Sequence, residues 1–174
     1  MSPERNQNSI TLEEIISNAK EIMLRDGNHV PVVIMEADNK VVAGQIPYLP
    51  PTHGERVELM RFLGQAAAKS GRVNRLQQIF MVTEGWMREA SEDKPPEMPP
   101  SDDPNKKEVL IISAIQMKER KKHLKVYEVF RDQDEQVVGI EEFSPEGKNE
   151  ESVEVPLLDA FVEGFHLAFR TRYN

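Results

Sequence analysis

The chain has 174 residues, of which 39% are hydrophobic, and its 30 acidic and 22 basic side chains give a net charge of −8. This length suits one domain, residues 1–174, and the acidity disfavours non-specific binding to nucleic acid or to an anionic membrane. The absence of cysteine excludes disulfides, thiolate metal sites and cysteine nucleophiles. No apolar run is long enough to cross a membrane and the start lacks a signal-peptide core, so we expect a cytoplasmic protein with a flexible tail at residues 1–9.

The first predicted element is a helix. Thr11 and Glu14 have the spacing of a capping box, in which each side chain bonds a backbone N–H at the start of the helix. Apolar residues then recur at helical spacing, namely Leu12, Ile15, Ile16, Ala19, Ile22 and Met23. Asp26-Gly27 ends the helix.

A hairpin and a second helix follow. Residues 30–37 and 41–43 are rich in β-branched residues and are separated by a turn at residues 38–40. Prolines predict a loop over residues 47–54, and a helix is expected from about Glu55 to Ser70. Its predicted buried stripe consists of Leu59, Phe62, Leu63, Ala66 and Ala67.

The second half of the chain is predicted to be mainly β. A buried strand at residues 76–83 is separated by a long Pro-rich loop, residues 91–107, from three strands at residues 108–117, 124–130 and 136–142. A final apolar-faced helix begins near Pro156. The short connections predict an α+β fold, with a mostly antiparallel sheet of about six strands and three helices packed mainly on one face. The other face would then be open to a homodimer contact.

The first candidate site is the end of the strand at residues 76–83 together with the loop behind it. A carboxylate, the only tryptophan and a methionine follow this strand, and a strand end that leads into a long loop is a common place for binding. The residues assigned to this site are Glu84, Trp86, Met87, Pro99, Pro100, Ser101 and Asp102. The alternative is that Trp86 caps the core, Glu84 is solvated and the loop is a rigid connection.

The second candidate site is a basic cluster at a predicted hairpin tip. It consists of Lys118, Arg120, Lys121, Lys122 and Lys125. On an acidic protein, such a cluster can dock a phosphate or an acidic partner. The alternative is a charged turn that protects a pair of strands. Because no aromatic residue lies among these charges, the pattern does not favour stacking on single-stranded nucleic acid, and nucleic acid is not the expected partner.

The sequence predicts neither a metal nor a cofactor. The four histidines, His29, His53, His123 and His166, are too far apart along the chain to form a helical metal pair. No glycine-rich phosphate loop and no Gly-x-Ser-x-Gly nucleophile motif is present.

Three stretches of the sequence together resemble a group of uncharacterised bacterial and phage proteins. They are Thr83-Glu84-Gly85-Trp86-Met87, Pro99-Pro100-Ser101-Asp102-Asp103-Pro104 and Lys107-Glu108-Val109-Leu110. Proteins of that group have a similar Glu-Ala-Trp-Met stretch and a Pro-Pro-Ser loop, and Gly85 stands here in place of the alanine. The resemblance centres on residues 76–112 and implies no activity. It does imply that Glu84, Trp86 and the loop act as one unit.

The leading functional hypothesis is a non-enzymatic intracellular binding or accessory module, because no catalytic set is evident. Its protein or small-molecule partner would bind the surface formed by Trp86 and the Pro-rich loop. One alternative is a hydrolase or transferase whose site is assembled from Glu84, Ser101, Asp102 and a histidine. A further alternative is contact with nucleic acid or an acidic partner through the basic cluster.

Overall fold

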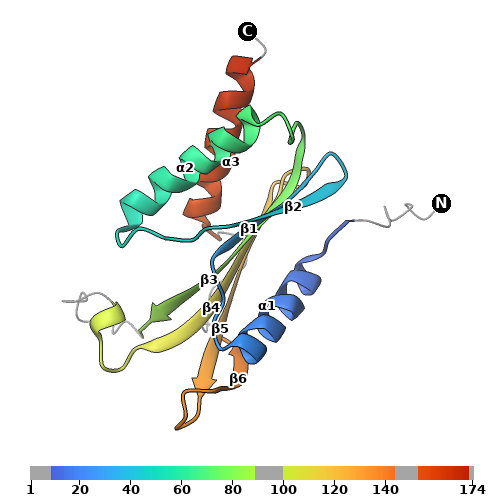
Figure 1. Cartoon of the computed structure of the whole chain (residues 1–174). Helices are drawn as coiled ribbons and strands as arrows, with labels where there is room; N and C mark the ends of the chain where they lie inside the picture. Colours follow the sequence, from blue (N-terminus) through green and yellow to red (C-terminus); the bar gives the residue numbers. More distant parts are fainter. Residues whose placement is uncertain (1–8, 89–99, 144–152, 173–174) are drawn as a thin grey trace.

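A six-stranded antiparallel sheet runs through the computed structural model, which describes residues 9–88, 100–143 and 153–172 (Figure 1). In chain order the elements are α1 (Leu12–Asp26), β1 (Val32–Ala37), β2 (Lys40–Gln45), α2 (His53–Lys69), β3 (Leu76–Met87), the short 3-10 helix η1 (Pro100–Asp102), β4 (Lys107–Gln116), β5 (Lys121–Arg131), β6 (Val137–Glu142) and α3 (Pro156–Arg172). The strand order is β2-β1-β3-β4-β5-β6. The predicted α+β class, antiparallel sheet and three helices are confirmed.

One face of the sheet is covered by α1. The predicted capping box is present, since Glu14 N donates to Thr11 Oγ1 over 3.2 Å and Thr11 N donates to Glu14 Oε2 over 2.7 Å. Gly27, with φ of 74°, ends the helix in the left-handed conformation that glycine adopts without strain. The buried side of the helix packs on the sheet through Ile15, Ala19, Met23, Phe80, Val82, Leu110 and Ile112.

The start of α1 is tied to the sheet by the buried carboxylate of Glu36. Glu36 Oε2 accepts hydrogen bonds from Ser9 Oγ over 3.0 Å and from Ile10 N over 3.2 Å. Gln78 Nε2 donates to the same oxygen over 2.6 Å and also to Ile10 O over 2.6 Å. These bonds satisfy the polar groups that the fold buries at this point. Ser9, which the sequence assigned to a flexible tail, is therefore bonded to β1. Residues 1–8 lie outside the described part of the chain.

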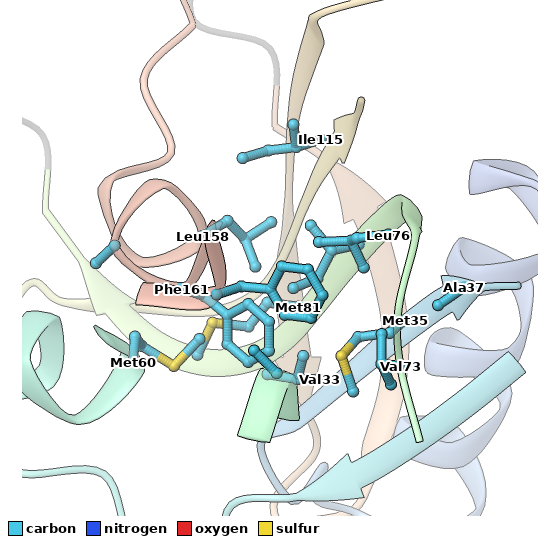
Figure 2. Packing of buried hydrophobic residues seen from close by; sticks show 14 of the residues in the cluster. Val33, Met35, Ala37, Met60, Val73, Leu76, Met81, Ile115, Leu158 and Phe161 are labelled. Atoms are coloured by element: carbon cyan, nitrogen blue, oxygen red, sulfur yellow. The ribbon is translucent and has the colours of Figure 1, made fainter. Parts of the chain in front are cut away.

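The opposite face of the sheet is covered by α2 and α3. Figure 2 shows Met60 of α2, with Leu158 and Phe161 of α3, gathered over Val33 and Met81 of the sheet. Two of the three helices, α2 and α3, therefore share one face, as the prediction of helices mainly on one face requires, and α1 covers the other face. The reason is that the central strands are apolar on both sides, with residues 79 and 81 facing one layer and residues 80 and 82 the other. Both faces need cover, so neither is left open for a dimer as the sequence suggested.

The contact between α2 and α3 corrects the predicted buried stripe of α2. A Cβ on Gly64 would lie 2.0 Å from Phe161 O, and a Cβ on Gly164 would lie 2.1 Å from Arg61 O, so the two helix backbones touch at these glycines. The side of α2 that contains Gly64 is consequently the buried one, with Met60 and Ala68. Leu59, Leu63 and Ala67 of the predicted stripe do pack against this core, whereas Ala66 is exposed and Phe62 is 65% exposed.

Three element boundaries differ from the predictions. Helix α2 begins at His53, before the predicted Glu55, because Thr52 and Glu55 form a second capping box. Strand β3 continues beyond Thr83 to Met87, paired with β4 throughout. Strand β5 begins at Lys121, so part of the predicted basic turn belongs to a strand.

Candidate functional site

The end of β3 extends beyond the strand next to it. Strand β1 pairs with β3 as far as Val32 opposite Val82. Strand β4 continues to pair with β3 as far as Lys107 opposite Met87. One edge of residues 83–87 therefore has no strand beside it in the part of the chain that the structure describes (Figure 1).

The hydrogen-bond pattern shows which backbone groups lie on this edge. Met117 N donates to Gln77 O over 3.0 Å, which identifies Gln77 as a residue of β3 that bonds to the β4 side. Backbone groups of an antiparallel strand point alternately to its two neighbours. Odd-numbered residues of β3 therefore bond to β4, whereas the N–H and C=O groups of Glu84 and Trp86 point to the side without a strand. We call these groups the open edge of β3.

A hollow of about 460 Å³ lies beside the open edge. It is lined by Pro51, Arg56, Glu84, Gly85, Trp86, Ser101 and Glu108. We call it the Trp86 hollow. It brings together three of the residues that the sequence singled out, Glu84, Trp86 and Ser101, which come from β3 and from η1.

Trp86 is half-exposed and is held by the loop after η1. Its side chain is 45% exposed and belongs to neither apolar cluster of the described residues. Lys106 Nζ lies 4.4 Å from the centroid of the indole ring, a cation–π contact. The same ammonium donates to Ser101 O over 2.6 Å. Lys106 therefore fixes both the aromatic ring and η1, so the ring is presented on a structured surface.

Glu84 connects the hollow to the segment that leads into β1. Its carboxylate accepts a hydrogen bond from His29 N. His29 itself is 7% exposed, and its ring Nδ1 lies 2.9 Å from Val30 O. Glu84 is therefore engaged by backbone rather than freely solvated, and this contact holds the segment before β1 in place next to the open edge.

Glu108, which lines the hollow, is paired with an arginine. Arg131 donates to both carboxylate oxygens of Glu108, over 2.7 and 2.6 Å, in the two-bond geometry that suits a guanidinium. It also donates to Gly27 O over 2.7 Å and to Glu135 O over 2.8 Å. The hydrogen bonds to Glu108 raise the pKa of Arg131, which keeps the guanidinium charged.

The remaining wall is formed by Arg56 at the start of α2. Its Nε donates to Pro50 O over 2.6 Å and its Nη2 to Pro51 O over 3.4 Å. Among the described residues these carbonyls, and no carboxylate, are its hydrogen-bond partners. Arg56 thus shapes the proline loop and adds a positive charge to a hollow that Glu84 and Glu108 also line.

The other predicted site residues lie near the hollow without lining it. Met87 is half-buried at the end of β3, and Pro100 to Asp102 form η1. Ser101 Oγ donates to Asp102 Oδ1 over 3.3 Å. Pro99 and residues 91–98 of the predicted loop lie outside the described part of the chain.

The hydrolase or transferase alternative requires a histidine ring beside Glu84, Ser101 or Asp102. The described contacts of Glu84 with a histidine involve the backbone N of His29, and the His29 ring is hydrogen bonded to Val30 O. His123 contacts Gln116 Oε1 at 3.3 Å, and the His166 ring lies edge-on to Phe165. The contacts described for His29, His123 and His166 do not include Glu84, Ser101 or Asp102.

The basic cluster is partly neutralised within the fold. Lys122 Nζ lies 2.8 Å from Asp159 of α3, and Lys125 Nζ lies 2.8 Å from Glu142 of β6. Lys118, Arg120 and Lys121 remain at the hairpin tip, where Arg120 adopts a positive φ of 51°. The cluster is therefore smaller than the sequence suggests and lies on a different part of the sheet from the Trp86 hollow.

Within residues 9–88, 100–143 and 153–172, no three histidine, aspartate or glutamate side chains come close enough together to hold a metal ion. No helix of the described chain is long and apolar enough to span a membrane.

The fold defines an α+β protein in which one helix covers one face of a six-stranded antiparallel sheet and two helices cover the other. Residues 1–162 match the model of the family described as bacteriophage lambda protein ea47, and the chain belongs to that family. No curated protein and no solved structure matches the chain. The resemblance to phage proteins is thus confirmed at the level of the family, over far more of the chain than residues 76–112. The family's description names no activity and no ligand.

Sequence reasoning missed several residues around the hollow. No sequence pattern around Pro51 or Arg56 indicates that they lie beside β3, because only the packing of α2 on the sheet brings them there. Arg131 lies 23 residues from its partner Glu108, and no spacing rule connects them. Glu108 did have a signal, since it belongs to the Lys107-Glu108 pair on which the resemblance was based.

Proposed function

We propose that this protein is a non-enzymatic binding module that captures an extended segment of a partner protein at the Trp86 hollow. One observation carries the proposal: the backbone groups of Glu84 and Trp86, which face no strand in the described part of the chain, lie beside the half-exposed indole of Trp86. An extended peptide can add a strand to such an edge, where main-chain hydrogen bonds give affinity and side-chain pockets give specificity.

The surroundings support a segment that carries an acidic side chain. Lys106 and Arg56 both donate to backbone carbonyls. Their charges are not cancelled by carboxylates in the described contacts, whereas Glu108 is already paired with Arg131. A carboxylate from the partner could pair with Arg56, which lines the hollow, or with Lys106 on the Trp86 ring, on the side away from Glu84. The indole would meanwhile cover an apolar residue of the same segment, as aromatic anchors do at binding sites.

The proposal is tested with peptides selected from a displayed random library against the whole chain. Trp86 is the only tryptophan, so its fluorescence reports on occupation of the hollow without any label. We expect binding of the selected peptide to shift this fluorescence. The double variant Glu84→Gln, Trp86→Ala should lose the peptide, measured by calorimetry, while its circular dichroism stays unchanged. Phe62→Ala is the matched control, because it removes an exposed aromatic side chain from another surface.

Pairing of the peptide with the open edge of β3 can be tested separately, by methylating the peptide backbone. Methylating single backbone nitrogens of the bound peptide should weaken binding at every second position, because alternate N–H groups face β3. Equal binding by the double variant and the wild type would contradict the proposal. Uniform tolerance of methylation would leave capture by Trp86 intact but exclude pairing with the open edge.

A further inference from the structure

Strand β2 forms a sheet edge that is accessible and unprotected. Each of its residues is exposed, with Val41 at 46% and Val42 at 38%. Proteins usually protect such edges with prolines, bulges or charges. Strand β2 contains no proline, pairs with β1 without a break in register, and has a single charge, Lys40, at its start. The opposite edge, β6, is protected by a register shift in its pairing with β5 and by two terminal glutamates.

The surface that continues from β2 is also neutral. Residues 41–52 contain no charged side chain, in a chain of which 30% of the residues are charged. Tyr48, within this stretch, is 68% exposed. Because each copy of the chain carries a net charge of −8, two copies repel each other least where they meet through an uncharged surface.

The hydrogen bonds of the β1–β2 hairpin show which groups the edge presents. Ile46 N donates to Pro31 O over 2.7 Å, which places residue 46 in the set that bonds to β1. By alternation, the same set contains Lys40, Val42 and Gly44. The N–H and C=O groups that point away from the sheet are those of Val41, Ala43 and Gln45.

We propose that two copies of the chain pair antiparallel through β2, with Ala43 opposite Ala43 of the second copy on a two-fold axis. In this register Val41 is opposite Gln45 of the second copy, so every outward group of β2 finds a partner and about six hydrogen bonds form between the chains. A register centred on Val42 would instead place Gln45 opposite Asn39. The N–H of Asn39 already donates to Gln77 Oε1 over 2.9 Å, so it could not also donate to the second copy.

The side chains fit this register. Val42 lies opposite Gly44, and the small Ala43 meets its own copy at the axis, so large side chains do not collide. Lys40 lies opposite Ile46, so no like charges face each other. On the α1 side, a groove of about 490 Å³ beside β2 is lined mainly by apolar side chains, among them Val32, Ile34, Val41 and Ala43. The two-fold axis places both grooves on the same side of one continuous sheet.

The test places a positive or a negative charge at residue 43, on the two-fold axis, and measures the oligomeric state of the full chain in each case. The wild type is expected to sediment as a dimer in analytical ultracentrifugation. Ala43→Lys and Ala43→Glu should each sediment as monomers, because like charges would face each other across the axis. An equimolar mixture of the two variants should restore a dimer that contains one of each. Circular dichroism checks the fold, which these substitutions at an exposed position leave intact.

Val138→Lys is the control, since Val138 is 60% exposed on the opposite edge strand β6. This variant should remain a dimer. A monomeric wild type would overturn the inference. So would a dimer that persists in both Ala43 variants, a mixture that stays monomeric, or a dimer lost on changing Val138. The inference does not involve the Trp86 hollow, so each proposal can fail without the other.

Discussion

The two faces of the sheet are covered in different ways. Helix α1 packs on the sheet directly, through residues that recur at helical spacing in its own sequence. Helices α2 and α3 touch each other through their backbones at Gly64 and Gly164 and cover the sheet together. The buried residues of α1 can therefore be predicted from the sequence of α1 alone. Those of α2 depend on its close backbone contact with α3, which is far away in the chain.

The largest expected effect comes from removing a matched core side chain on each face. Met23 of α1 and Met60 of α2 are both fully buried. We expect Met23→Ala and Met60→Ala each to lower the free energy of unfolding by about 3 kcal/mol, measured by urea denaturation, because each leaves a cavity. Hydrogen exchange should show α1 loosened in the first variant, and α2 with α3 in the second. Equal loosening of all three helices in both variants would show that the two layers are not separable.

A smaller effect should follow from a single added methyl group at the contact between α2 and α3. Gly64→Ala would place its Cβ against Phe161 O, and we expect a loss of about 2 kcal/mol or more in unfolding free energy. Gly54→Ala is the control in the same helix, where a Cβ meets nothing within 4 Å. That variant should gain up to about 1 kcal/mol, because alanine restricts the unfolded chain. Changes of the same sign in the two variants would contradict the backbone contact.

The two capping boxes should contribute about equally. Thr11→Ala and Thr52→Ala each remove the hydroxyl that accepts a backbone N–H, and each should cost about 1 kcal/mol of stability in thermal or urea unfolding. Ser17→Ala, at an exposed position within α1, is the control and should be neutral or slightly stabilising. A loss at Ser17 as large as that at Thr11 would point to another role for these hydroxyls.

The smallest effect is expected at Phe62. Its side chain has the sequence pattern of a buried residue but is 65% exposed. We therefore expect Phe62→Ala to change the unfolding free energy by less than about 0.5 kcal/mol. A loss of several kcal/mol would mean that the Phe62 side chain is buried in the folded protein.

The candidate site was predictable in part. Glu84, Trp86 and Ser101 were singled out because a carboxylate and the only tryptophan follow an apolar strand and precede a proline-rich loop, and the structure brings these three residues to one hollow. The open edge was not predicted, because the sequence places the end of the strand at Thr83. Whether β3 has a neighbour there depends on where β1 begins, and no pattern within β3 contains that information.

The sequence by itself determined the elements that local chemistry specifies. These are the capped helix α1, the hairpin of β1 and β2, the antiparallel order of the later strands, and the exclusion of thiol chemistry. Only the tertiary structure decided which face each helix covers and which side of α2 is buried, because two glycines allow α2 and α3 a backbone contact that side-chain periodicity does not encode. It also decided that, among the described residues, β2 and the end of β3 each have one side without a neighbouring strand, since strand pairing joins segments far apart in the chain. Those edges are where both proposals are located.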